Sequence, residues 1–223
     1  MKDIFHIAID GPTASGKGTV ARALSARLGI PCLDTGAMYR ATAVYIRDRG
    51  LDAKSETVVT DALEALKMDV TVTDGITQVR VNGKDVTPSL RENDISRDSS
   101  IIATYPAVRK FLVTQAQEIA KAESFILEGR DIAKVVLPNA KYKFYLTADV
   151  KIRALRRQAD LKAKGTEISF KEILKQIKQR DRRDTQKGGL VKVREAIVID
   201  DTNLNIKQTV ERFISHISEC GGL

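Results

Sequence analysis

The chain of 223 residues is 43% hydrophobic and carries a net charge of +8. This length and composition suit one globular domain, and the lack of any run of about 18 apolar residues excludes a membrane-spanning helix. Because the first apolar run begins at residue 4, we expect no signal peptide, and the two cysteines, Cys32 and Cys220, are typical of a reduced, cytoplasmic protein.

The charge is distributed unevenly along the chain. Residues 141–194 contain 17 lysines and arginines against 6 aspartates and glutamates, a net charge of +11, so the rest of the chain totals −3. A basic segment of this kind binds either nucleic acid or the phosphates of small nucleotides. Phe170 is the only aromatic residue of 151–194. Because proteins that bind single strands usually interleave aromatic residues for base stacking, this composition disfavours nucleic acid.

A glycine-rich loop follows the first predicted strand, residues 4–9, and precedes a helical pattern with Val20 and Leu28 on one face. Its spacing, G-x-x-x-x-G-K, is that of the P-loop, in which backbone N–H groups, the helix N-terminus and the lysine bind phosphates. A plain glycine-rich turn is the disfavoured alternative. Glycine directly follows the lysine, so the hydroxyl expected near a Mg²⁺ ion is that of Thr19. The predicted phosphate-binding residues are Gly11, Pro12, Thr13, Ala14, Ser15, Gly16, Lys17, Gly18 and Thr19.

The next segments repeat the strand–helix order and then change character. A short buried strand at 31–34 leads into a helix that ends near residue 49, and a further helix is expected over 56–67. Two stretches with period-two alternation then follow, with Asn82-Gly83 as a hairpin signal. We interpret 68–91 as an antiparallel insertion, and the alternative is an edge hairpin of the main sheet.

Helices and strands alternate again to the C-terminus. Five short apolar strands between helices predict a parallel α/β sheet, in which ligands bind at the carboxyl ends of the strands. We therefore expect the P-loop, residues 34–40 and Gly129-Arg130-Asp131 to converge on one crevice. The remaining predicted elements are helices over 92–104, 107–121, 150–164 and 169–184, strands at 125–127, 142–146 and 196–200, and a last helix capped by Asn203.

Several motifs in the same order resemble a known family. The loop is similar to the P-loop of nucleoside monophosphate kinases, where glycine commonly follows the lysine. Residues 33–40, LDTGAMYR, resemble the L-D-[ST]-G-A-x-Y-R stretch of bacterial cytidylate kinases, as do Gly129-Arg130-Asp131 with 135–140 and the segment 177–184. The resemblance spans nearly the whole chain.

The resemblance implies a single kinase domain with a P-loop NTPase-type fold. This fold is a five-stranded parallel sheet flanked by helices, with a small antiparallel β insertion and a helical lid. We expect the core to comprise 1–67, 92–150 and 190–223, the insertion about 68–91, and the lid about 151–189.

The resemblance also implies roles for individual residues. A carboxylate, Asp131, accepts the exocyclic amine that distinguishes cytosine from uracil, with Ser100 and Arg109 also on the base. Lys187 stands where relatives carry a phosphate-binding arginine, so the charge is kept and the bidentate fork is lost. Arg156 belongs to the lid with two neighbouring arginines. The residues implied in binding the acceptor nucleotide are Thr35, Tyr39, Arg40, Ser100, Arg109, Arg130, Asp131, Arg180, Asp184 and Lys187, and those implied in phosphoryl transfer are Lys17, Arg130, Arg153 and Arg157.

The expected activity is the direct in-line transfer of the γ-phosphoryl group of ATP, with Mg²⁺, to CMP or dCMP. The expected partners are these small nucleotides, with no nucleic acid or membrane, and the expected state is a monomer. The nearest alternative is a kinase of the same class that acts on UMP. From another class, the basic segment suggests a P-loop nucleic-acid-binding switch, and a purely structural module is disfavoured by the P-loop.

Overall fold

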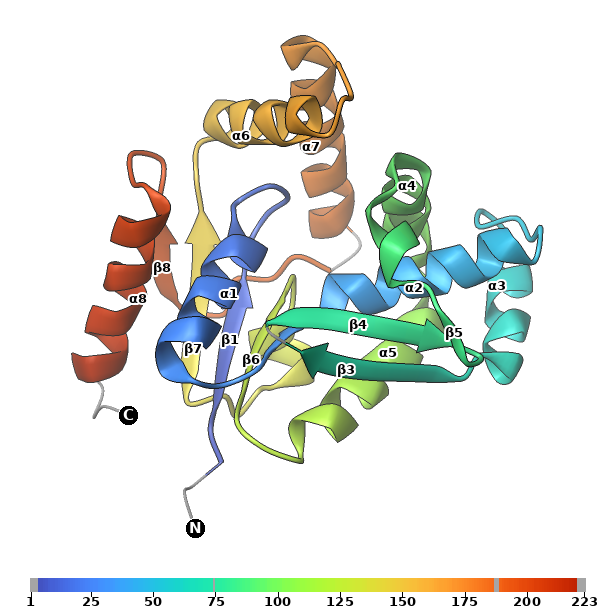
Figure 1. Ribbon diagram of the computed structural model, residues 1–223, viewed down its shortest axis with the longest axis horizontal. Helices are drawn as coiled ribbons and strands as arrows, with labels where there is room; N and C mark the ends of the chain where they lie inside the picture. Colours follow the sequence, from blue (N-terminus) through green and yellow to red (C-terminus); the bar gives the residue numbers. More distant parts are fainter. Residues whose placement is uncertain (1–3, 74, 187–188, 220–223) are drawn as a thin grey trace.

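The main sheet of the protein has five parallel strands in the order β2-β6-β1-β7-β8. The structure is a computed structural model that describes residues 4–73, 75–186 and 189–219. It confirms the predicted parallel α/β architecture, with helices on both faces (Figure 1). The strands are β1 (His6–Asp10), β2 (Cys32–Asp34), β6 (Phe125–Gly129), β7 (Tyr142–Thr147) and β8 (Ile197–Asp200).

Side chains of β1 alternate between the two faces of the sheet, as the period of a strand requires. Ile7 and Ile9 pack into one cluster with the apolar sides of α1 (Lys17–Leu28) and α8 (Ile206–Glu219). Ala8 belongs to the opposite cluster. The helices that contribute to this second cluster are α2 (Thr35–Asp48), α3 (Glu56–Ala62), α4 (Asn93–Ile102) and α5 (Pro106–Ala120).

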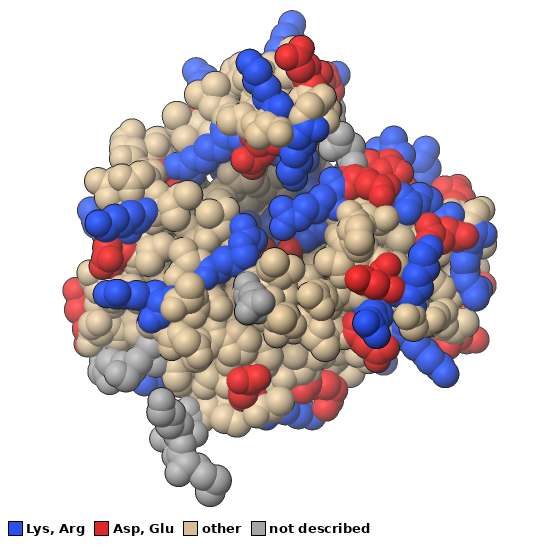
Figure 2. Space-filling model, in the orientation of Figure 1, with Lys and Arg blue, Asp and Glu red and all other residues tan. Residues whose placement is uncertain are grey.

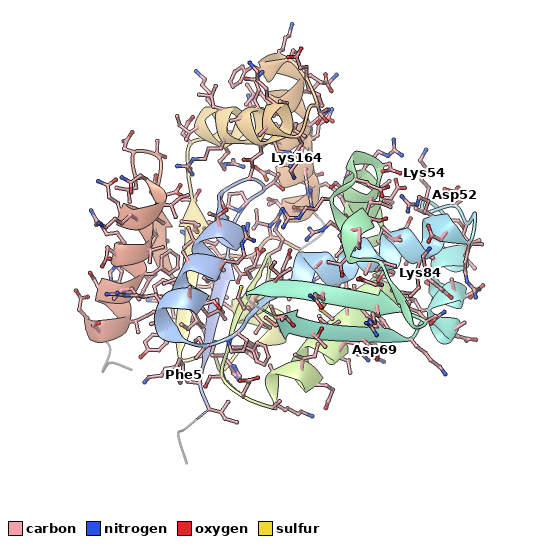
Figure 3. The ribbon with its side chains drawn as sticks, in the orientation of Figure 1. Phe5, Asp52, Lys54, Asp69, Lys84 and Lys164 are labelled. Carbon is pink, nitrogen blue, oxygen red and sulfur yellow. The ribbon has the colours of Figure 1, made fainter. Side chains whose placement is uncertain are left out.

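The predicted insertion forms a separate antiparallel sheet, which excludes the alternative of an edge hairpin of the main sheet. Its strands are β3 (Met68–Thr73), β4 (Ile76–Val81) and β5 (Lys84–Asp85), followed by a short 3₁₀ helix, η2 (Thr87–Arg91). Thr77 of β4 joins this sheet to the end of β2, because the backbone N–H of Asp34 donates to its Oγ1 at 2.9 Å. Lys84 pairs with Asp48 of α2 at 2.9 Å, and Figure 3 shows Lys84 and Asp69 on the insertion side of the molecule.

Helices α6 (Val150–Ala163) and α7 (Phe170–Gln186), the segment expected to form the lid, lie over the carboxyl edge of the main sheet (Figure 1). They have a small apolar cluster of their own, with Ala154 and Leu161 of α6 against Ile173 and Ile177 of α7. No helix within the described residues has the length and apolarity needed to cross a membrane.

Two local predictions are wrong. The helix expected over 56–67 ends at Ala62 and continues as one 3₁₀ turn, η1 (Leu63–Ala65). Asn205, rather than Asn203, caps α8: its Oδ1 accepts from the Gln208 N–H at 2.9 Å, and Gln208 Oε1 accepts from the Asn205 N–H at 2.9 Å. This reciprocal pair is a capping box, and the sequence offered two asparagines for one cap.

We expect Thr77→Val to weaken the link between the insertion and the main sheet. Valine has nearly the same shape but leaves the Asp34 N–H without its acceptor, so the free energy of unfolding should fall by about 1–3 kcal/mol in urea titrations. Thr71→Val is the matched control, because Thr71 is exposed on β3, and it should change stability by less than about 0.5 kcal/mol. Equal effects of the two substitutions would contradict this role of Thr77.

Candidate active site

The three polar segments expected to converge line one cavity of about 1150 Å³. They follow β1, β2 and β6, which are neighbours because β6 lies between the other two strands. The cavity continues along α4, under α6 and α7, and to the loop before α8. Figure 2 shows lysine and arginine side chains gathered around the hollow between the lid and the rest of the molecule. A basic cavity of this size suits small anions better than an extended nucleic acid.

The P-loop wraps around the ammonium group of Lys17. Gly16 adopts a left-handed conformation, with φ of 85°, at the N-cap of α1, which favours glycine there. Lys17 Nζ donates to the carbonyl of Pro12 at 2.9 Å and to Ser15 Oγ at 3.3 Å. The predicted residues from Thr13 to Thr19 line the cavity, whereas Gly11 and Pro12 do not.

Buried positive charge is concentrated beside the P-loop. Lys17 is only 5% exposed, and burial followed by the charge of Arg130 lowers its pKa to about 7. Glu128 and Asp10 oppose this shift. Burial and the nearby Asp34 raise the pKa of Glu128 itself to about 7. The site therefore stabilises a negatively charged ligand, which would restore the affinity of Lys17 for its proton.

Two arginines of the cavity have a buried N–H without a partner among the described residues. These are the Nε groups of Arg40 and Arg180. Arg40 Nη2 pairs with Asp34 at 2.5 Å, whereas burial and the charge of Arg130 lower the pKa of Arg180 to about 10. An unsatisfied buried donor is costly, and a phosphate oxygen is the acceptor that guanidinium groups fit best.

Arg130 and Asp131 are held by the sheet edge behind them. The backbone N–H groups of Ile132 and Ala133 donate to the buried Asp10 carboxylate at 2.7 and 2.9 Å. Burial raises the pKa of Asp10 to about 6, and these two hydrogen bonds oppose the shift. Asp10 thereby fixes the start of the π-helical turn η3 (Ile132–Val136), directly after the two functional side chains.

The far end of the cavity contains the side chains expected to bind the base. Asp131 is 6% exposed and pairs with Arg109 of α5, and burial raises its pKa while Arg109 opposes the shift. Ser100 of α4 accepts a hydrogen bond from Arg183 Nη1 of α7 at 2.7 Å. Tyr39 and the other expected acceptor residues of the described chain, Thr35, Arg40, Arg130, Arg180 and Asp184, line the same cavity.

The lid arginines differ in their placement. Arg156 and Arg157 line the cavity, but Arg153 does not. Arg153 Nη1 donates to the carbonyl of Thr13 at 2.7 Å and to Asp181 Oδ2 at 2.6 Å, so its guanidinium binds protein groups. The contact of Arg153 with donor phosphates stays a prediction. Lys187 lies outside the described residues.

Sequence reasoning did not single out Asp181, Glu128 or Arg183. Asp181 Oδ1 accepts from the Thr13 N–H at 2.9 Å and so ties α7 to the P-loop. A Cβ at Gly18 would lie 3.1 Å from Glu128 Oε1. Glycine after the lysine therefore leaves room for this carboxylate. The unusual position of Gly18 could be read from the sequence, but its neighbour Glu128 lies on a strand more than a hundred residues away.

Comparisons with known proteins show what the whole chain is similar to. The family model described as cytidylate kinase matches residues 7–219. The chain is 40% identical over 215 residues to a cytidylate kinase of Fervidobacterium nodosum, covering 96% of each chain, and 41% identical over 208 residues to one of Caldanaerobacter subterraneus subsp. tengcongensis, covering 92% of this chain and 91% of that one. Among solved structures, an uncharacterized protein of Eubacterium ventriosum has a similar fold, with a TM-score of 0.54, 16% identity and coverage of 97% and 99%.

We expect Lys17→Met to stabilise the ligand-free protein while it abolishes phosphoryl transfer. In the folded protein the pKa of Lys17 is about 7, below its usual 10.5. Burial of the ammonium group therefore lowers the free energy of unfolding by its full amount below pH 7. This loss of stability decreases as the pH rises toward 10.5. The gain in unfolding free energy should be roughly 2–4 kcal/mol near pH 6 and under about 1 kcal/mol near pH 10.

Urea titrations at both pH values measure this difference. Lys164→Met is the control, because Lys164 is an exposed residue of the lid (Figure 3). A gain for Lys17→Met that does not depend on pH, or a loss at pH 6, would refute the electrostatic origin of the effect.

Proposed function

This chain belongs to the cytidylate kinase family, and on that premise we propose that it transfers the γ-phosphoryl group of ATP to CMP or dCMP. The observation that carries the proposal is the shared cavity. Its lining combines the P-loop, the Asp131–Arg109 pair and arginines of α2, α6 and α7. This combination suits a donor triphosphate and an acceptor nucleotide.

The P-loop end suits the donor. Backbone N–H groups of residues 14–18 and the N-terminus of α1 favour the β- and γ-phosphates, with Lys17 as a mobile cation. Arg157 extends the positive charge from the lid, whereas Arg156, which also lines the cavity, pairs with Asp201 at 2.8 Å. Leu204 and Ile206 line the same side of the cavity and offer apolar contact for the donor base.

The opposite end suits the acceptor. The unpartnered Nε groups of Arg40 and Arg180 favour the α-phosphate of the monophosphate. We expect Thr35 and Asp184, which line the same cavity, to contact the ribose. Asp131 accepts from the exocyclic amine of cytosine, whereas the corresponding atom of uracil is a carbonyl oxygen that a carboxylate repels.

The transfer itself needs no covalent intermediate. The attacking oxygen of the acceptor phosphate is already anionic, so the protein need not supply a strong base. Lys17 and Arg130 stabilise the charge that develops on the transferred group, because both are preorganised beside the P-loop. The lid excludes water that would otherwise hydrolyse ATP.

The residues beside the P-loop fit a Mg²⁺ ion. The hydroxyl of Thr19 and the carboxylates of Asp34 and Glu128 line the cavity, and oxygen ligands are those that Mg²⁺ prefers. No cluster of three or more potential metal ligands occurs in residues 4–73, 75–186 and 189–219, so phosphate oxygens and water would complete the coordination. The ion would neutralise charge on the β- and γ-phosphate oxygens.

A panel of monophosphates with ATP tests the proposal. We expect rapid turnover of CMP and dCMP and slow turnover of UMP. Asp131→Asn should lower kcat/KM for CMP by at least about tenfold, because a buried group that reads the base amine is lost, and should affect UMP less.

Asp69→Asn is the control, because Asp69 is exposed on the insertion (Figure 3). A clear preference of the unmodified enzyme for UMP, or an equal loss of both activities in Asp131→Asn, would overturn the assignment of the base site.

A further inference from the structure

Asp181 and Arg153 hold both backbone polar groups of Thr13 in the P-loop. The Thr13 N–H donates to Asp181 Oδ1 at 2.9 Å, and the Thr13 carbonyl accepts from Arg153 Nη1 at 2.7 Å. The same Nη1 pairs with Asp181 Oδ2 at 2.6 Å, so the three residues close one ring of contacts. Asp181 lies on α7 and Arg153 on α6, and Figure 1 shows both helices above the loop between β1 and α1. We call this pair of side chains the Thr13 clamp.

Ala14, the residue after Thr13, has a left-handed backbone conformation with φ of 58°. Among the described residues other than glycine, only Asn82 also has a positive φ. Asparagine is favoured in this conformation because its short polar side chain bonds locally, whereas alanine is not. Alanine therefore keeps a left-handed backbone only where its surroundings impose it.

Two contacts with α6 and α7 impose this conformation. The Thr13 carbonyl belongs to the peptide group before Ala14, so the hydrogen bond from Arg153 that orients this carbonyl also restricts φ of Ala14. The Ala14 methyl group packs against the small apolar cluster between α6 and α7. The conformation of the P-loop at this residue is therefore set by two helices that lie far from it in the sequence.

We propose that Asp181 is a positioning residue that acts, together with Arg153, on the conformation of the P-loop, an inference that rests on the proposed function. Neither side chain lines the cavity, so both act through the backbone of Thr13. Ala14 is the first of the residues, 14–18, whose backbone N–H groups are expected to bind the donor phosphates. The Thr13 clamp therefore favours binding of ATP and has little influence on the acceptor.

Charge and geometry predict opposite consequences of removing the Asp181 carboxylate. A negative charge beside the P-loop repels the donor phosphates, so its loss alone should strengthen ATP binding. The clamp, however, needs two acceptor oxygens, and asparagine has only one. Asp181→Asn therefore loses the bond to Thr13 or the bond to Arg153, lets Ala14 relax, and should weaken ATP binding. The sign of the change separates the two effects.

The test measures the dissociation constants of ATP with Mg²⁺ and of CMP by calorimetry. We expect Asp181→Asn to raise the constant for ATP by about tenfold, the scale of one hydrogen bond to a charged group, and that for CMP by less than about twofold. Glycine adopts a positive φ without support, so Ala14→Gly should remove the need for the clamp. In the Ala14→Gly background, Asp181→Asn should raise the constant for ATP by at most about twofold.

A second variant breaks the Thr13 clamp from the other helix. Arg153→Met should also weaken ATP binding, and by less in the Ala14→Gly background than in the unmodified chain. An arginine that contacted the donor phosphates directly would instead give the same loss in both backgrounds. A loss that does not depend on residue 14 would therefore exclude Arg153 from the positioning role.

Two control variants accompany the test. Glu172→Gln is matched to Asp181→Asn, because Glu172 is an exposed carboxylate of the same helix, and it should change neither dissociation constant. Ala163→Gly is matched to Ala14→Gly, because Ala163 is an exposed alanine at the end of α6, and it should not rescue Asp181→Asn.

Tighter ATP binding by Asp181→Asn, an equal loss of ATP and CMP affinity, or the same loss in both backgrounds would overturn the role of Asp181. The proposed function is judged separately, by turnover. If the unmodified protein binds ATP and does not phosphorylate CMP, the proposed function fails, whereas the affinities for ATP still decide whether the Thr13 clamp positions the P-loop.

Discussion

The buried positive charge at the carboxyl edge of the sheet is the constraint on which the rest of the structure depends. Lys17 and Arg180 both have a lowered pKa, because each is buried and each lies near Arg130. The Nε groups of Arg40 and Arg180 have no acceptor among the described residues. Such an arrangement is unfavourable in the empty protein and favourable around phosphates. The free-energy cost of this buried charge explains why many hydrogen bonds and ion pairs hold the surrounding elements in place.

Three of these hydrogen bonds meet at Thr13. Its N–H donates to Asp181, its carbonyl accepts from Arg153, and its hydroxyl accepts from Arg130 at 2.9 Å. The P-loop is thereby connected to both lid helices and to the turn after β6. A shift of α6 or α7 would therefore disturb the hydrogen bonds that hold the P-loop backbone at this residue.

Much of the fold and the composition of the site follow from the sequence, because they depend on local patterns. Strand periodicity and the spacing of the P-loop are properties of short segments, and the convergence of 34–40 with Gly129-Arg130-Asp131 follows from parallel strands. The sequence does not predict which lid arginine enters the cavity. Helical spacing places Arg153 and Arg157 on the same face of α6, but the packing of α6 on α7 turns Arg153 toward Asp181.

Local sequence patterns also could not predict contacts between segments that are far apart in the chain. The bond between Arg183 and Ser100 and the approach of Glu128 to Gly18 each join elements far apart in the chain. The choice of Asn205 over Asn203 as a cap depended on where the loop after β8 leaves the sheet. In each case the residue type was visible, and only the tertiary arrangement selects its partner.

The most direct test of the central claim is the number of protons taken up when ATP binds with Mg²⁺ near pH 8, measured by calorimetry in buffers of different ionisation enthalpy. The nucleotide is fully ionised at that pH, whereas Lys17, with a pKa of about 7, is mostly neutral. Phosphates beside the lysine should restore its charge, so we expect an uptake approaching about one proton per ATP, absent in Lys17→Arg. Binding without proton uptake would contradict a cavity whose buried charge is completed by its ligand.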